Sequence, residues 1–272
     1  MHAASRYALA QLSASLDEDL RGEDQAIAAA AQIGTELFDV VEVLDEERRL
    51  RTSVADVSLS ADQRAGLIAA VFADKVSLST LKLLRAAAAK EWSTPREFRA
   101  GLVQLGRRAI LRSADLQGQL LQVEDELFRL SRLLLKQPQL ALRLDDRSAD
   151  SLKRRELFAH ILYGKVTAAT ETLALQVVGR REANIIDDLH EISTYAASMW
   201  GREVAYVESA VELSESQKQA LSSKLERIYG RAMSIHLEVN PSLLGGMIIR
   251  VDDEVIDGSY TGKIDRLRLL QV

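Results

Sequence analysis

Residues 240–270 read NPSLLGGMIIRVDDEVIDGSYTGKIDRLRLL, and this stretch specifies a local fold more tightly than any other part of the chain. Pro241 has no N–H and follows an apolar run, so the chain must turn there. Gly245-Gly246 tolerates positive φ, and the apolar run after it is broken by Asp252-Asp253, a pair suited to a hairpin turn. Asp257-Gly258-Ser259 then offers side-chain oxygens to the first turn of a helix. The stretch therefore predicts a β-hairpin followed by a helix.

The residues before this stretch extend the same small domain. Val204, Tyr206 and Val207 are β-branched or aromatic and predict a strand. Ser214 to Gln217 has the spacing of a capping box before a helical pattern, and Gly230 lies where that helix is expected to end. Residues 234–239 alternate polar and apolar side chains, which predicts a second strand. Residues 201–272 are thus expected to form a C-terminal α/β domain of order β-α-β-β-α.

The first 200 residues are rich in Ala and Leu, and their apolar residues recur at helical spacing. Ser5 is a candidate N-cap for a first helix that carries Tyr7 on its apolar stripe. Ser60 to Gln63 signals another helix start, and Thr94-Pro95 places proline at the first position of a long helix. The predicted fold class is mainly α with a small α+β C-terminal domain.

The helical part contains an internal repeat at an offset of about ninety residues. Apolar, charged and hydroxyl positions all recur without a gap. The recurring pairs are Glu36 and Glu126, Phe38 and Phe128, Asp56 and Asp146, Arg64 and Arg154, Lys75 and Lys165, and Thr80 and Thr170. Chance overlap of two apolar patterns does not explain the charged matches, so we infer that a helical unit was duplicated. The expected organisation is an N-terminal helical bundle (1–112), a second helical repeat unit (113–200) and the C-terminal domain (201–272).

Composition narrows the class of protein. The chain has 272 residues, 28% of them charged and 47% hydrophobic, with a formal charge of -5. This acidic balance gives no reason to expect nucleic acid as a partner. The chain has no cysteine, which excludes disulfides and thiolate chemistry. Neither a signal peptide nor a run of roughly 20 apolar residues is present, so we expect membrane association only through a partner.

Sequence motifs for catalysis, cofactors or metals are missing. The four histidines (His2, His160, His190 and His236) are not at ligand spacing, and a structural or solvated role is favoured for each. There is neither a Walker A pattern nor GxGxxG, so no nucleotide site is expected. We therefore predict no catalytic, cofactor-binding or metal-binding residues.

Several weaker signals have a structural and a functional interpretation. The acidic residues between 252 and 257 are able to bind a hard cation, but a hairpin tip and a helix cap explain them better. Trp92 and Trp200 are expected to pack near helix ends, and an exposed indole at a partner groove is the less favoured alternative. The basic runs Lys153 to Arg155 and Arg180-Arg181 are interpreted as solvated helix faces.

The C-terminal stretch resembles the signature of the delta subunit of F-type ATP synthases, the family of the mitochondrial oligomycin-sensitivity-conferring protein. The residues that carry the resemblance are 240–246, 249–251, 255–259, 262–264 and Leu267. The family usually has Asp where this chain has Asn240. Arg6-Tyr7-Ala8 also resembles the opening of the family. With its repeat, the chain resembles a long form that carries a duplicated helical unit.

The resemblance implies a non-catalytic stator subunit, present once per complex at the cytoplasmic face of the cell membrane. It also implies that the N-terminal bundle receives the N-terminal helix of an alpha subunit, and that the C-terminal domain meets the b subunits. The residues expected to determine the signature structurally are Pro241, Gly245, Gly246, Asp257, Gly258 and Ser259.

An alternative from another class is an unrelated helical adaptor, or a small enzyme whose site is dispersed. The C-terminal signature discriminates between the two hypotheses, because neither an adaptor nor such an enzyme predicts it.

Overall fold

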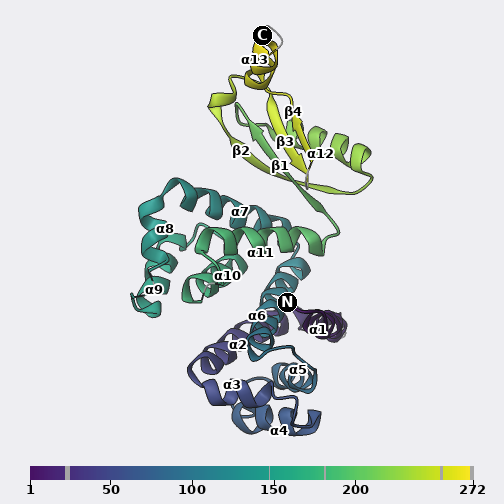
Figure 1. Cartoon of the computed structure of the whole chain (residues 1–272), viewed down its shortest axis with the longest axis vertical. Helices are drawn as coiled ribbons and strands as arrows, with labels where there is room; N and C mark the ends of the chain where they lie inside the picture. Colours follow the sequence, from purple (N-terminus) through teal and green to yellow (C-terminus); the bar gives the residue numbers. More distant parts are fainter. Residues whose placement is uncertain (22–24, 147, 181, 252–253, 270–272) are drawn as a thin grey trace.

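The computed structural model of the chain describes residues 1–21, 25–146, 148–180, 182–251 and 254–269. The described part of the first 200 residues consists of helices joined by turns, and a small sheet lies at the C-terminal end (Figure 1). The first helices are α1 (Ala3–Arg21), α2 (Ala26–Glu46), α3 (Arg48–Val54), α4 (Ala61–Phe72), α5 (Leu78–Ala89) and α6 (Pro95–Leu116). Within the described ranges, no helix combines the length and the apolar character needed to cross a membrane.

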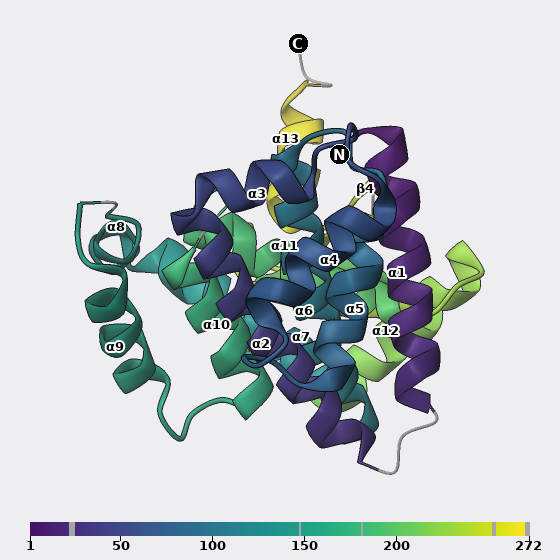
Figure 2. The same ribbon diagram turned by 90° about the horizontal axis from the view of Figure 1, so that it is seen from below.

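The second group of helices repeats the order of the first. It consists of α7 (Leu120–Lys136), α8 (Pro138–Leu144), α9 (Ser151–Leu162), α10 (Ala168–Gly179) and α11 (Ile185–Met199). Helices α8, α9 and α10 begin and end ninety residues after α3, α4 and α5, and α11 begins ninety residues after α6. The repeat seen in the sequence is therefore a repeat of helices. In both views α8 and α9 lie at the outer edge of the molecule, on the side away from α1 (Figures 1 and 2).

The turn before α5 and the corresponding turn before α10 have the same hydrogen bonds to a carboxylate. In the first unit Glu36 Oε2 accepts from Ser77 N at 2.9 Å and from Ser77 Oγ at 2.8 Å. In the second, Glu126 Oε2 accepts from Thr167 N and Oγ1, both at 2.9 Å. Thr170 Oγ1 also donates to Glu126, at 2.6 Å. These carboxylates tie the start of α5 to α2 and the start of α10 to α7, so the repeated polar residues are structural.

Both carboxylates are expected to make stability fall at acid pH. Burial would raise the pKa of Glu126, but hydrogen bonds from Thr170 and Thr167 outweigh it, so the pKa lies below its ordinary value, and Glu36 behaves alike. A lowered folded-state pKa stabilises the fold above the unfolded pKa, and this contribution is lost as pH falls through the folded pKa. Melting temperatures from pH 7 to pH 3 should therefore fall less steeply for E126Q than for the wild type. E156Q, at an exposed position of α9, should keep the wild-type slope; equal slopes for all three proteins would contradict the prediction.

The C-terminal part has the order β-α-β-β-β-α, one strand more than the predicted β-α-β-β-α. Its elements are β1 (Glu203–Ser209), α12 (Glu215–Tyr229), β2 (Met233–Val239), the 3-10 helix η1 (Pro241–Leu243), β3 (Met247–Val251), β4 (Glu254–Asp257) and α13 (Tyr260–Leu269). The strand order is β2-β1-β3-β4, with β1 parallel to β2 and antiparallel to β3. Strands β3 and β4 form the predicted hairpin, with Ile249 opposite Ile256; its predicted turn, Asp252-Asp253, lies outside the described residues. The fold class predicted from the sequence is confirmed.

Helix α6 contributes to the cores of both helical units. Leu105 and Ala109 belong to a cluster with the helices of the first unit, whereas Ile110 and Leu111 belong to a cluster with those of the second. A third cluster, around Val207, lies between the sheet and α12. The boundary expected after residue 112 thus falls inside a continuous helix that both units share. Figure 1 shows α6 running from the first helical group into the second.

The predicted role of Ser5 as an N-cap is wrong. Helix α1 begins at Ala3, and Ser5 is buried within it. Its hydroxyl donates to Glu97 Oε2 at 2.7 Å and accepts from Ser93 N at 3.0 Å. Tyr7 does not lie on the buried stripe either, because its side chain is exposed. Sequence spacing identified the helix correctly, but the polar partner of Ser5 comes from a distant segment.

Candidate functional site

The predicted signature residues come together where β3, β4 and α13 meet. Gly258 N donates to Met247 O, and Tyr260 N donates to Gly245 O, each at 2.9 Å. Gly246 has φ +75°, and a Cβ on it would lie 2.3 Å from Gly258 O. The Gly245-Gly246 segment and Gly258 are therefore in contact through their backbones, which explains why both places have glycine.

Gly245 is required for space rather than for its backbone angle. A Cβ at this position would lie 2.5 Å from a ring carbon of Tyr260. The left-handed residue on its N-terminal side is Leu244, with φ 59°, which the sequence analysis did not predict. Such a conformation is uncommon for a residue with a side chain, and the sequence gives no local signal for it.

Asp257 and Ser259 form the predicted cap of α13. Asp257 Oδ1 accepts from Ser259 N at 2.9 Å and from Ser259 Oγ at 2.7 Å. Ser259 Oγ in turn accepts from Gly262 N at 3.0 Å, which satisfies a free N–H of the first turn. The hydrogen bonds from Ser259 hold the pKa of Asp257 below its ordinary value. The signature thus fixes where α13 starts and how it leaves the sheet.

Pro241 is the first residue of η1 and lies two positions after the last residue of β2, so the chain turns there as the missing N–H predicts. Asn240 Oδ1 accepts from Ser242 N at 3.1 Å and caps this turn. Its amide nitrogen donates to Glu208 Oε2 on β1, also at 3.1 Å. An ionised Asp, the residue usual in the family that the signature resembles, accepts but does not donate. The Asn in this chain therefore adds a contact to β1 that a carboxylate would not make.

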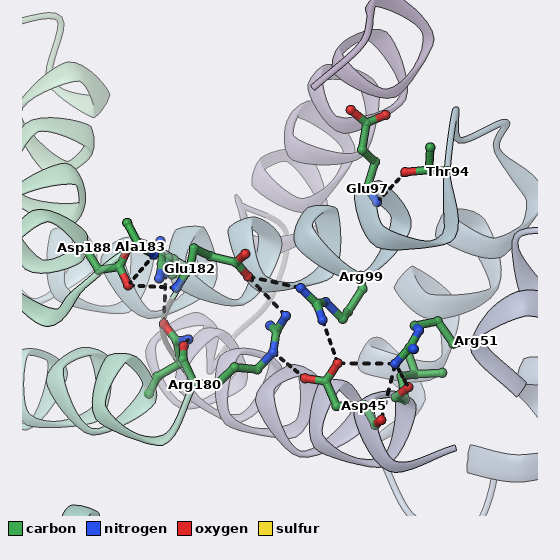
Figure 3. Close-up of polar contacts among 12 residues, drawn as sticks. Asp45, Arg51, Thr94, Glu97, Arg99, Arg180, Glu182, Ala183 and Asp188 are labelled. Carbon is green, nitrogen blue, oxygen red and sulfur yellow. Dashed lines mark hydrogen bonds and ion pairs between the residues drawn. The ribbon is translucent and has the colours of Figure 1, made fainter. Parts of the chain in front are cut away.

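A second polar constellation lies where the two helical units meet, and the sequence did not reveal it. Arg99 on α6 contacts Asp45 at 2.8 Å and Glu182 at 3.6 Å. Arg180 contacts the same two carboxylates, Glu182 at 3.1 Å (Figure 3). Arg51 on α3 adds a longer contact to Asp45, at 3.5 Å. This four-residue junction network (Asp45, Arg99, Arg180, Glu182) joins α2 and α6 to the turn between α10 and α11.

The interpretation of Arg180 as a solvated residue is therefore wrong: only 14% of its side chain is exposed. Arg181, its predicted companion, lies outside the described residues. Arg155 was also expected to be solvated, but it forms an ion pair with Glu42 of the first unit. Arg155 lies on α9 and Arg180 in the turn after α10, and packing of the two units brings both against carboxylates of the first unit.

The other side of the junction ties α1 to α11. Asp17 bridges Arg108 at 2.6 Å and Arg112 at 2.5 Å, both on α6. Burial would raise the pKa of Asp17, but hydrogen bonds from these two arginines outweigh it and lower the pKa. Arg108 also donates to the hydroxyl of Tyr195 on α11, at 2.8 Å. Three helices from both units are thus connected through two guanidinium groups.

The two tryptophans differ in environment. Trp92 is buried, as predicted, and its indole N–H donates to Ala87 O at 2.8 Å. Trp200 is partly exposed, and its indole N–H donates to Asp115 Oδ1 at 3.0 Å. The second contact holds the end of α11 against the end of α6, directly before the chain enters β1.

The centre of the junction contains a fully buried charge. Arg107 on α6 is 1% exposed, and its Nε donates to Gln176 Oε1 on α10 at 2.9 Å. Burial holds the pKa of Arg107 below its usual value, against the opposing charge of Asp188. Asp188 is buried as well and accepts from Glu182 N at 2.8 Å. Because a buried guanidinium is costly unless its partners stay in place, this arrangement favours one fixed angle between the units.

The described residues contain no group of three or more His, Asp or Glu side chains arranged to hold a metal ion. The polar clusters found here are paired internally across helix contacts. Their geometry is suited to holding helices and strands together. The junction fixes the two helical units against each other, and the signature fixes α13 against the sheet.

Comparisons with known proteins identify the family of the chain. A family model described as ATP synthase delta (OSCP) subunit matches residues 108–270. The ATP synthase subunit delta of Corynebacterium diphtheriae is 64% identical over 269 residues, covering 98% of each chain. That of Corynebacterium efficiens is 63% identical over 268 residues, 98% of this chain and 97% of the relative.

A chain in the cryo-EM structure of the Toxoplasma gondii mitochondrial ATP synthase hexamer aligns at 17% identity and a TM-score of 0.36. It covers 61% of this chain and 94% of that chain, and the similarity is too low to bear on the fold. The family match covers more than half of the chain, and the relatives are similar over nearly all of it. The chain therefore belongs to the ATP synthase delta (OSCP) subunit family.

Proposed function

We propose that this chain is the non-catalytic delta subunit in the peripheral stalk of an F-type ATP synthase. The observation that carries the proposal is the nearly full-length similarity to ATP synthase delta subunits. As a stator component, the subunit would couple proton flow to ATP synthesis by holding the catalytic head still while the rotor turns. The unrelated adaptor and the enzyme with a dispersed site are set aside, because neither accounts for this family membership.

The proposed partners are the N-terminal helix of an alpha subunit and the far end of the b subunits. The first would bind the N-terminal bundle by laying its apolar face into a groove between helices. The second would bind the C-terminal domain, where Leu244, Tyr260 and Ile264 are exposed close to the signature. Exposed apolar side chains near one another are typical of protein contact sites.

The junction supports a mechanical role. A linker that transmits torque must resist bending, and the two helical units are connected by the shared helix α6, the buried Arg107 and the junction network. Several partner contacts made at the same time by one rigid subunit would together bind more tightly than each contact alone. The duplicated unit would then lengthen the body between its two ends.

The proposed location is the cytoplasmic face of the cell membrane, with one copy per complex and attachment to the membrane only through the other subunits. The proposed organisation is an N-terminal bundle (1–112), a second helical unit (113–200) and a C-terminal domain (201–272). The three hydrophobic clusters support this division, with the qualification that α6 belongs to two of them.

Deletion of residues 201–272 is expected to separate the two attachments. The truncated subunit should still bind the catalytic head, because the helical part keeps its own cores, whereas recovery with the b subunits should be lost. Affinity purification of the tagged subunit from solubilised membranes, followed by immunoblotting for alpha and b, measures both. The full-length tagged subunit is the control. Recovery of the full-length protein without either partner would contradict the stator proposal, and equal loss of both partners on truncation would contradict the division of labour.

A further inference from the structure

The polar face of the sheet packs on the second helical unit. Ser234, His236 and Glu238 alternate along β2 and therefore point to the same face. This face meets α7 through Glu124, Phe128 and Arg132, and β1 meets α11 through a contact of Tyr206 with His190. We refer to the contact of β1 and β2 with α7 and α11 as the joint. Figure 1 shows the sheet above α7 and α11, connected to them by one passage of the chain from α11 into β1.

A histidine and a carboxylate are buried opposite each other in the joint. Glu124 and His236 are each 3% exposed. His236 Nε2 lies 2.9 Å from Glu124 Oε1, and Ser234 Oγ donates to the same oxygen. The His236 ring stacks on Phe128, with ring centroids 4.1 Å apart. An ionised carboxylate buried this deeply is strongly stabilised by a positive charge beside it, which a protonated imidazole provides.

The other charged groups that face His236 are paired among themselves. On α7, Arg132 lies 3.6 Å from Glu238 of β2, and Lys136 lies 3.9 Å from the same carboxylate. Across the sheet, Arg250 of β3 lies 2.6 Å from Glu208 of β1. The Arg250–Glu208 pair is neutral, whereas Arg132 and Lys136 share the one carboxylate of Glu238 and the three together carry a net charge of +1. The contacts of both cations are with Glu238, and the ring that contacts Glu124 belongs to His236. The charge opposite Glu124 therefore depends on His236.

The second histidine of the joint does not compete for this role. His190 Nε2 lies 3.0 Å from the hydroxyl of Tyr206. Burial, followed by the positive charges of Arg132 and His236, holds the pKa of His190 below its ordinary value. Its other charged neighbour is Asp187 on the same helix, which opposes this shift. His190 is thus neutral near neutral pH.

A cavity borders the joint. A cavity of about 410 Å³ lies elsewhere, between α7 and α9, but one of about 240 Å³ borders His236 itself. The second cavity is lined by Phe128, His190, Tyr206 and His236 among others. Among the described residues, the second ring nitrogen of His236, Nδ1, has no hydrogen-bond partner. Histidine is the side chain whose charge changes most readily near physiological pH.

We propose that His236 is a pH-sensitive latch that sets the angle between the helical body and the C-terminal sheet. Protonated, it neutralises Glu124 and holds β2 against α7. When the ring loses its proton, Glu124 stays buried opposite an uncharged partner, and the joint opens toward water. The joint is therefore tight at the acid side of the ring's titration and loosens as pH rises through it. The inference concerns the chain alone, so its failure would leave the stator proposal untouched.

The absence of cysteine makes the test direct. Spin labels on K153C in α9 and K224C in α12, both exposed positions, report the distance between the two bodies in the full chain. Pulsed electron paramagnetic resonance from pH 5.5 to 8.5 should show a narrow distance distribution that broadens with rising pH. Because one proton is linked, the ratio of closed to open forms should fall by at most about tenfold per pH unit. The pH at the midpoint of this broadening should equal the pH at the midpoint of the change in the NMR chemical shift of a His236 ring carbon.

Three variants complete the test. H236Q should remove the pH dependence and leave a broad distribution throughout, because Glu124 then always faces an uncharged side chain. E124Q removes the buried carboxylate charge itself, so its distribution should no longer broaden as pH rises. H160Q, which changes an exposed histidine of α9, should behave as the wild type. If H236Q fails to fold, the agreement between the NMR titration and the distance change in the wild type still decides the matter. A distribution independent of pH in the wild type, or a pH response that survives in folded H236Q, would overturn the proposal.

Discussion

Replacing Gly246 by valine is expected to reduce the stability of the C-terminal domain by about 3 kcal/mol or more. Gly246 has φ +75°, a conformation that is strongly unfavourable for a β-branched residue. Its new Cβ would also lie 2.3 Å from Gly258 O, and this neighbour is backbone that cannot rotate away. The substitution would therefore push the start of α13 away from β3 and break the backbone contact between the two glycine segments.

Hydrogen exchange followed by mass spectrometry measures this effect region by region in the full chain. Faster exchange is expected in β3, β4 and α13 of G246V, with little change in α1 to α11. G66V is the matched control, because Gly66 lies on an exposed face of α4 and a Cβ there meets nothing within 4 Å. It should change stability by about 0.5 kcal/mol or less. Wild-type exchange in G246V would mean that Gly246 does not determine the signature structurally.

Replacing Asp45 by asparagine is expected to destabilise the helical part by about 2 kcal/mol. The substitution keeps the shape of the side chain but removes the charge that Arg99, Arg180 and Arg51 share. Arg99 and Arg180 would then face Glu182 alone, with only 19% and 14% of their side chains exposed to water. The cost comes from leaving partly buried guanidinium groups without their anion.

Urea unfolding of the full chain measures this cost. D19N is a suitable control, because Asp19 pairs with Lys82 at 2.8 Å on the surface, where the side chains are 49% and 69% exposed. An exposed pair contributes about 0.5 kcal/mol or less, and its contribution falls with added salt. D45N should lower the unfolding midpoint clearly more than D19N. Equal shifts would show that the junction network contributes no more than a surface ion pair.

Local sequence patterns predicted most of the elements. Ser214 and Gln217 form the expected capping box of α12, and Gly230 ends that helix with φ 71°. The family expected from the C-terminal signature is also confirmed by the relatives. These features could be predicted because caps, turns and hairpins depend on residues within a few positions of one another.

Local sequence patterns were not sufficient to predict how the two copies of the duplicated unit pack together. The matching of Glu36 with Glu126 was visible in the sequence, and the structure adds that both carboxylates hold the start of a later helix, α5 or α10, in the same way. That one helix, α6, closes the first unit and also packs into the second was not visible. The repeat was predicted as two successive units, whereas the fold shares an element between them.

The sequence by itself determined most of the helices and strands and the cap formed by Asp257 and Ser259, because these rest on short-range backbone preferences. It also revealed the repeat, because the two copies keep matching residues at a constant offset. Only the tertiary structure decided which charges are buried. Asp45, Arg99 and Arg180 are charged residues of the kind expected on a solvated surface. Glu124 and His236 lie more than a hundred residues apart in the sequence. They become partners because packing brings distant helices and strands together, and the energy of a charge depends on what surrounds it in space.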